Sequence, residues 1–252
     1  MLKYNLNKKT PERVRWVMGT LCSIEAPGAA FSSITAAFEE IERWDRILSL
    51  YKEESELCAL NARAGLGPTR VSAELFVAVA SALRYAELTE GLFEPTLGWR
   101  DIVLDARLRE IALPAGARLD FGGFGKGWAL DQAARVLKEE GAGAALLNFG
   151  GQVLAVGAPE GADGWLVTVP GAPAPLLLRD ESVAVSGDSE RPGHIRSPFD
   201  GKAVRRPGSA AAVCPTATEA DAWSTPLYVL GSNPKSFRGR SFFDHAVQGG
   251  RS

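Results

Sequence analysis

The order in which helix-like and strand-like patterns occur along the chain restricts its fold more than any other feature. Apolar residues recur at three- and four-residue steps in residues 33–48, 72–88 and 126–140, which predicts amphipathic helices, and a fourth helix is expected to begin near Thr216. Helices concentrated in the N-terminal half, followed by a mixed or antiparallel sheet in the C-terminal half, predict an α+β fold rather than regular βαβ alternation. The short apolar or alternating runs that predict strands lie at residues 144–149, 165–169, 176–178, 183–185 and 210–213.

Length and charge narrow the class of protein. With 252 residues, of which 46% are hydrophobic and 23% charged, the chain can bury a substantial core in one large domain or two intimate lobes. The formal net charge is −2 and the basic residues are not clustered, so a nucleic-acid partner is not expected. No stretch approaches the roughly 18 consecutive apolar residues that a membrane-spanning helix needs, so no membrane span is expected.

The cysteines and the N-terminus indicate a reducing compartment. Cys22, Cys58 and Cys214 are an odd number at wide spacing, which favours buried thiols over a disulfide framework or a zinc site. The first residues carry positive charge without an apolar segment behind it, which is not the pattern of a secretory signal. We therefore expect a cytoplasmic protein.

The first segment that could carry chemistry is rich in glycine. From Asp120 to Gly127 the chain reads D-F-G-G-F-G-K-G, directly before a predicted helix. Glycine allows the backbone to approach a ligand closely, the N–H groups at the start of a helix attract anions, and Lys126 adds a positive charge. The spacing matches neither a P-loop nor a dinucleotide fingerprint. The segment therefore fits either a phosphate site or a tight turn packed against the sheet.

A second segment combines a carboxylate and a hydroxyl. From Thr216 to Thr225 the chain reads T-A-T-E-A-D-A-W-S-T, and Asp221 and Thr225 are four residues apart, which places them on one face of a helix. Such oxygen ligands suit Mg²⁺. The alternative is structural, because Thr216 with Glu219, or Thr218 with Asp221, has the spacing of a capping box.

Two further residues lie in segments with loop composition. His194 is one of only two histidines and lies between glycine and proline signals. Asp188 ends the turn-like sequence Ser186-Gly187-Asp188. Taken alone, such a histidine is more typical of a solvated or hydrogen-bonded bystander than of a catalytic base.

Taken together and in order, the segments resemble the FAD:protein FMN transferase (ApbE) family from Met18 to Gly231. The resemblance rests on eight motifs, each with its spacing kept in this sequence. They are M-G-T at 18–20, D-x-x-L-S-x-Y-x-x-x-S-E-L-x-x-L-N at 45–61, T-E-G-x-F-E-P-T at 89–96, D-F-G-G-x-x-K-G-x-x-x-D at 120–131, N-x-G-G at 148–151, S-G-D at 186–188, H-I at 194–195 and A-D-A-x-x-T at 220–225.

The resemblance implies a fold, a reaction and a site. The fold would be ApbE-like, and the enzyme would transfer FMN from FAD to a threonine or serine hydroxyl of an acceptor protein, with Mg²⁺ bound and AMP released. The metal ligands would be Asp221, Thr225 and the carbonyl of Gly123, and the base would be His194 or Asp188. The residues implied to bind FAD are Met18, Ser49, Tyr51, Glu94, Pro95, Thr96, Lys126, Asp131, Ser186 and His194.

The resemblance also sets expected boundaries and leaves an alternative open. Residues 18–231 would form the transferase domain, after an N-terminal extension at 1–17 and before an abbreviated tail at 232–252. The sequence departs from the family pattern at Ser197, where an aspartate is usual, and at Gln152, which replaces an aspartate. A divergent FAD-binding protein, or an FAD pyrophosphatase that does not modify proteins, therefore remains the alternative.

Overall fold

The structure is a computed structural model that describes residues 3–4, 12–96, 99–187, 195, 197–198 and 201–244. The predicted helices and strands are all present within one or a few residues of their expected ends. The helices are α1 (Phe31–Leu48), α2 (Glu56–Asn61), α3 (Ala73–Leu88), α4 (Gly125–Glu139), α5 (Ala217–Leu230) and the short 3-10 helix η1 (Trp99–Asp101). The strands are β1 (Lys3–Tyr4), β2 (Glu12–Val17), β3 (Thr20–Glu25), β4 (Thr69–Arg70), β5 (Val103–Asp105), β6 (Glu110–Ala112), β7 (Ala144–Phe149), β8 (Gln152–Gly157), β9 (Trp165–Thr168), β10 (Leu176–Leu178), β11 (Glu181–Gly187), β12 (Ser209–Cys214) and β13 (Arg240–Asp244).

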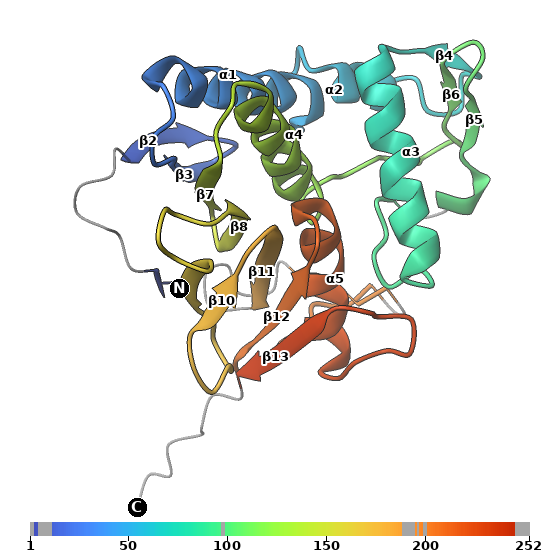
Figure 1. Cartoon of the computed structure of the whole chain (residues 1–252). Helices are drawn as coiled ribbons and strands as arrows, with labels where there is room; N and C mark the ends of the chain where they lie inside the picture. Colours follow the sequence, from blue (N-terminus) through green and yellow to red (C-terminus); the bar gives the residue numbers. More distant parts are fainter. Residues whose placement is uncertain are drawn as a thin grey trace, which may run out of the picture.

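A seven-stranded antiparallel sheet forms the centre of the described structure, in the order β13-β12-β11-β8-β7-β3-β2. Helices α1, α4 and α5 cover one face, and the small sheet β1-β9-β10 packs on the other through Trp165 and Val167 (Figure 1). Helix α3 and the third sheet, β4-β6-β5, lie beside the α1–α4 layer (Figure 1). The α+β fold with an antiparallel sheet is confirmed.

Two hairpin turns that the sequence did not predict bring the M-G-T motif and the N-x-G-G motif together. Met18 and Gly19 join β2 to β3 with φ values of 46° and 76°, and Gly150 and Gly151 join β7 to β8 with φ values of 53° and 84°. Two consecutive left-handed residues match the right-handed twist of the strands that they join. A Cβ on Gly150 would lie 2.7 Å from Thr20 Cγ2, so the two turns pack against each other.

Strand β2 reverses the usual relation between polarity and burial. Val14 and Trp16 are 54% and 71% exposed, whereas the alternate residues Arg13 and Arg15 face helix α1. Their guanidinium carbons lie 3.9 Å and 5.0 Å from the ring centroids of Phe31 and Phe38. Arginine can occupy this inner face because its stem and planar head pack on aromatic rings.

Both segments that flank the expected transferase domain contribute strands to the main sheet. Strand β2 lies in residues 1–17 and pairs with β3, and β13 lies in residues 232–252 and pairs with β12. In the part of the chain that the structure describes, no helix has the length and apolar character needed to cross a membrane.

Candidate functional site

The glycine-rich segment forms a turn that opens directly into helix α4. The Asp120 carboxylate accepts a hydrogen bond of 2.8 Å from the Gly122 N–H, which closes the first part of the turn. The residue before the helix is Phe124, whose own side chain makes no capping hydrogen bond. Lys126 lies in the first turn and donates to the Gly122 carbonyl at 3.3 Å. A glycine-rich helix start beside a lysine is an anion-binding arrangement.

Aromatic packing fixes the position of this turn. Phe124 is fully buried, and its ring lies 5.5 Å from that of Phe121 and 6.1 Å from that of Phe93. On its other side, the ring of Trp128 stacks at 5.6 Å with an interplanar angle of 20°, and Trp128 meets Trp44 of α1 edge-on at 5.4 Å. The glycine-rich turn therefore rests on a rigid apolar base.

The asparagine that ends the second motif holds the chain just before the glycine-rich turn. Asn61 donates to the Leu119 carbonyl at 3.0 Å and accepts from the Leu119 N–H at 2.8 Å. Within the same motif, Ser55 caps α2, and Glu56 accepts hydrogen bonds from the N–H and hydroxyl of Ser72, the N-cap of α3. Asn61 thus holds the segment before the glycine-rich turn, whereas Ser55 and Glu56 hold the starts of helices α2 and α3.

The predicted residues Glu94, Pro95 and Thr96 lie against the same segment. The Pro95 carbonyl accepts from the Asp120 N–H at 2.7 Å, and Thr96 Oγ1 accepts from the Arg118 N–H at 3.1 Å. Pro95 and Thr96 are buried and Glu94 is half-buried. Their backbone and hydroxyl contacts place the third motif beside the glycine-rich turn.

Asp131 holds the start of helix α5. Its carboxylate accepts hydrogen bonds of 2.8 Å from the N–H groups of Ala217 and Thr218, and another from the Thr218 hydroxyl. Burial raises the pKa of the Asp131 carboxyl, although these hydrogen bonds favour its ionised form. Thr216 is the N-cap, accepting from the Glu219 N–H at 3.1 Å, so the capping alternative is confirmed at Thr216. The sequence did not predict that Asp131 anchors this helix.

Helices α4 and α5 meet where only glycine fits. A Cβ on Gly127 would lie 2.3 Å from the Ala217 carbonyl oxygen. The same oxygen accepts a hydrogen bond of 2.6 Å from the amide of Gln152, which is 1% exposed. An ionised aspartate at this position could not donate this bond. In the sequence, only the motif indicated that Gly127 matters, because its close contact is with helix α5, which is distant in the sequence.

The two predicted metal-binding side chains lie on the face of α5 that meets the glycine-rich segment. Asp221 is 6% exposed, and its Oδ2 accepts from the Gly127 N–H at 3.0 Å, whereas its Oδ1 has no hydrogen bond with any described residue. A Cβ on Gly123 would lie 3.8 Å from Thr225 Oγ1. The structure therefore brings Asp221, Thr225 and Gly123 together.

This donor set fits a hard divalent cation. A carboxylate, whose second oxygen makes no hydrogen bond with a described residue, a neighbouring hydroxyl and nearby backbone carbonyls are the kinds of oxygen ligand that Mg²⁺ accepts, with water completing its coordination. Within the described residues, no three His, Cys, Asp or Glu side chains come together as a metal cluster. A softer ion such as zinc would need nitrogen or sulfur ligands.

The remaining predicted residues fall into three groups. Met18 is half-buried, and its Cε lies 3.7 Å from the position of a Cβ on Gly125, which places it at the glycine-rich turn. Ser49 and Tyr51 lie in the loop after α1, where Ser49 Oγ accepts from the Tyr51 N–H and the Tyr51 side chain is 93% exposed. Asp188 and His194 lie outside the described residues.

Ser186, predicted to bind the cofactor, contacts the turn of α5 that carries Thr225. Its Oγ lies 3.1 Å from Thr225 Oγ1 and 2.8 Å from Ser224 Oγ. Ser224 is buried and was not singled out from the sequence, because a serine between Trp223 and Thr225 has no distinguishing pattern.

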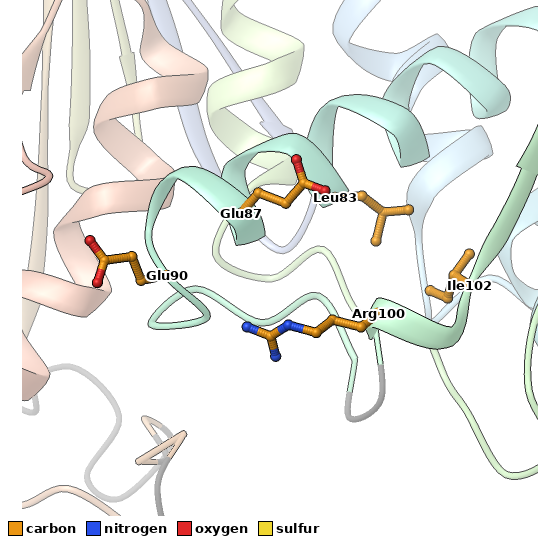
Figure 2. Close-up of a pocket in the computed structure, with 5 residues that line it drawn as sticks. All are labelled: Leu83, Glu87, Glu90, Arg100 and Ile102. Carbon is orange, nitrogen blue, oxygen red and sulfur yellow. The ribbon is translucent and has the colours of Figure 1, made fainter.

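A cavity of about 480 Å³ lies at the C-terminal end of α3, apart from these residues. Figure 2 shows Glu87 and Glu90 at the end of the helix and Arg100 and Ile102 on the segment that faces it. Leu83 completes the lining, and none of the five is a predicted site residue. Glu90 has a left-handed backbone, with φ of 57°, where the chain leaves the helix.

Fold and site together define an α+β protein in which a glycine-rich helix start faces an acidic and hydroxyl-bearing turn of a second helix. The ApbE family model matches residues 18–99 and 97–238, and the chain belongs to the ApbE family.

Known relatives agree with this family. The chain is 28% identical to the FAD:protein FMN transferase of Treponema pallidum, over 87% of this chain and 78% of the relative. It is 26% identical to that of Salmonella typhimurium, over 85% and 77%. The fold resembles the apo form of the flavinyl transferase ApbE of Pseudomonas stutzeri, with a TM-score of 0.79 and 19% identity over 90% and 86% of the two chains. The ApbE protein of Thermotoga maritima has a TM-score of 0.74 and 22% identity over 88% and 87%.

Proposed function

We propose that this chain is an FAD:protein FMN transferase that binds FAD and Mg²⁺ and attaches FMN to a threonine or serine of an acceptor protein. The observation that carries the proposal is the junction of α4 and α5, where the Gly127 N–H binds Asp221 and thereby holds Asp221 and Thr225 beside the glycine-rich turn. The relatives named for this reaction support it.

The residues have distinct roles in the proposed reaction. Lys126 and the start of α4 bind the pyrophosphate of FAD, which carries negative charge. Asp221, Thr225 and the Gly123 carbonyl would hold Mg²⁺, which when bound supplies positive charge to phosphate oxygens. Met18, Ser49, Tyr51 and the segment from Glu94 to Thr96 are proposed to line the rest of FAD.

The proposed chemistry is one displacement at phosphorus. The acceptor hydroxyl oxygen attacks the FMN-side phosphorus, the bond from this phosphorus to the AMP side breaks, and AMP leaves. His194 or Asp188 takes the proton of the attacking hydroxyl. The three unpaired cysteines are compatible with the cytoplasm as the proposed compartment.

The test incubates the chain with FAD, Mg²⁺ and a threonine-containing acceptor peptide, and follows AMP by chromatography and covalent flavin by gel fluorescence. We expect both products in equal amounts. Asp221→Asn should abolish both while leaving the fold intact, because the amide loses the charge but retains an oxygen for the Gly127 N–H. Asp163→Asn, which removes an exposed carboxylate, is the matched control.

Other outcomes would select the alternatives. AMP and free FMN without covalent flavin would indicate an FAD pyrophosphatase. Bound FAD without any AMP would indicate a binding protein. Full activity of Asp221→Asn would rule out the proposed metal site.

A further inference from the structure

Three hydroxyl groups form a continuous chain where β11 faces α5. Ser186 Oγ lies 2.8 Å from Ser224 Oγ and 3.1 Å from Thr225 Oγ1. Ser224 Oγ also contacts the backbone carbonyl oxygen of Asp221 at 2.9 Å. Ser224 is 2% exposed, so its hydrogen bonds are made within the protein. This chain of hydroxyl groups therefore links Thr225 to the backbone carbonyl of Asp221, the two residues with proposed metal-binding side chains.

Counting protons fixes the direction of each bond in this chain. A hydroxyl has one proton and two lone pairs, whereas a carbonyl oxygen can only accept. The Ser224 proton is therefore used on the Asp221 carbonyl, and Ser224 must accept from Ser186. The Ser186 proton is then used as well, so Thr225 must donate to Ser186. The direction runs from Thr225 through Ser186 and Ser224 to the Asp221 carbonyl.

This direction decides what Thr225 offers to a cation. A neutral hydroxyl binds a metal ion through a lone pair, and a proton pointing at the ion would oppose binding. Because the Thr225 proton points at Ser186, both lone pairs of Thr225 Oγ1 remain available on its other sides, including the side of Gly123.

We propose that Ser186 and Ser224 are positioning residues that fix the Thr225 hydroxyl as a lone-pair donor to the metal. They act through Thr225 and do not themselves contact the ion. The inference rests on the proposed function, which makes Thr225 a metal ligand. It also gives the serine of the S-G-D motif a role different from direct contact with FAD.

The test measures Mn²⁺ binding directly, in the presence of FAD and without acceptor, from the loss of the free-ion signal in electron paramagnetic resonance. Ser224→Ala and Ser186→Ala should each weaken Mn²⁺ binding about 10-fold, the scale known for residues that orient metal ligands. The double variant should also lose about 10-fold, because one break interrupts the whole chain. Ser186→Thr keeps a hydroxyl on a strand and should bind Mn²⁺ like the wild type.

A matched control separates this role from ordinary packing. Ser182→Ala removes another buried hydroxyl from β11. This hydroxyl donates to the Val153 carbonyl and is not part of the hydroxyl chain formed by Ser186, Ser224 and Thr225. It should lower the melting temperature without weakening Mn²⁺ binding. If Ser224→Ala does not fold, the half-buried Ser186→Ala carries the test alone.

Two failures have different meanings. If Asp221→Asn binds Mn²⁺ as tightly as the wild type, the proposed metal site itself is wrong. If Asp221→Asn abolishes Mn²⁺ binding while both serine variants bind normally, or if losses in the two serine variants multiply, the hydroxyl chain has no positioning role and the inference is overturned.

Discussion

Gly127→Ala tests whether the contact between α4 and α5 determines both stability and activity. By helix propensity alone, alanine inside a helix should stabilise the protein by about 1 kcal/mol relative to glycine. In this fold the new Cβ would lie 2.3 Å from the Ala217 carbonyl oxygen and 2.8 Å from Asp221 Cβ. Carbon and carbonyl oxygen normally approach to about 3.3–3.6 Å, so the helices must separate by about 1 Å.

The magnitude follows from two opposing terms. Overpacking of this kind costs about 1–3 kcal/mol, and the gain in helix propensity offsets about 1 kcal/mol of it. The net loss is therefore up to about 2 kcal/mol, which lowers the melting temperature of a chain of this size by up to about 8 °C. Separation of the helices also moves Asp221 from the glycine-rich turn, and a displacement of about 1 Å can reduce the rate about 100-fold.

The assay pairs thermal unfolding with Mg²⁺-dependent AMP release from FAD. Gly125→Ala is the matched stability control in the same helix, because its Cβ would lie at ordinary contact distances of 3.6 Å from Phe121 Cβ and 3.7 Å from Met18 Cε. It should melt at or slightly above the wild-type temperature. A Gly127→Ala protein that melts no lower than the wild type and releases AMP at the wild-type rate would refute the reasoning.

Three further predictions concern charge and burial. Lys126→Ala should weaken binding of FAD more than of FMN, because FAD alone carries the pyrophosphate, and equal losses in a flavin-fluorescence titration would contradict this assignment. Burial raises the pKa of Asp131, so the folded state holds this proton more tightly than the unfolded state. The stability that this carboxyl contributes is present below its pKa in the unfolded state, and it falls as pH rises through its pKa in the folded state. The difference in urea midpoint between wild type and Asp131→Asn should therefore shrink from pH 4 upward. Burial raises the pKa of the Cys22 thiol to about 12 and also raises that of Cys214, so a thiol reagent at pH 8 should label only the half-buried Cys58 in the folded protein and all three cysteines in urea.

Local patterns in the sequence predicted the four longer helices and five of the strands, and they pointed to the proposed metal-binding side chains. Helical periodicity located α1, α3 and α4, and the four-residue spacing of Asp221 and Thr225 placed them on one face of α5. These features depend on neighbouring residues, which a sequence displays directly.

Other features required the tertiary structure because they depend on residues far apart in the chain. The sequence predicted no strand at residues 12–17, and Arg15 faces inward there because it packs on Phe38 and pairs with Glu42 of α1. Nothing adjacent to Gly127 in the sequence requires glycine, and the reason lies 90 residues away, at Ala217. The proposed direction of the Thr225 hydroxyl on α5 likewise depends on Ser186, which lies on strand β11. Side chains can be assigned to a face by local spacing, but close approach and hydrogen-bond direction are decided only when distant segments meet.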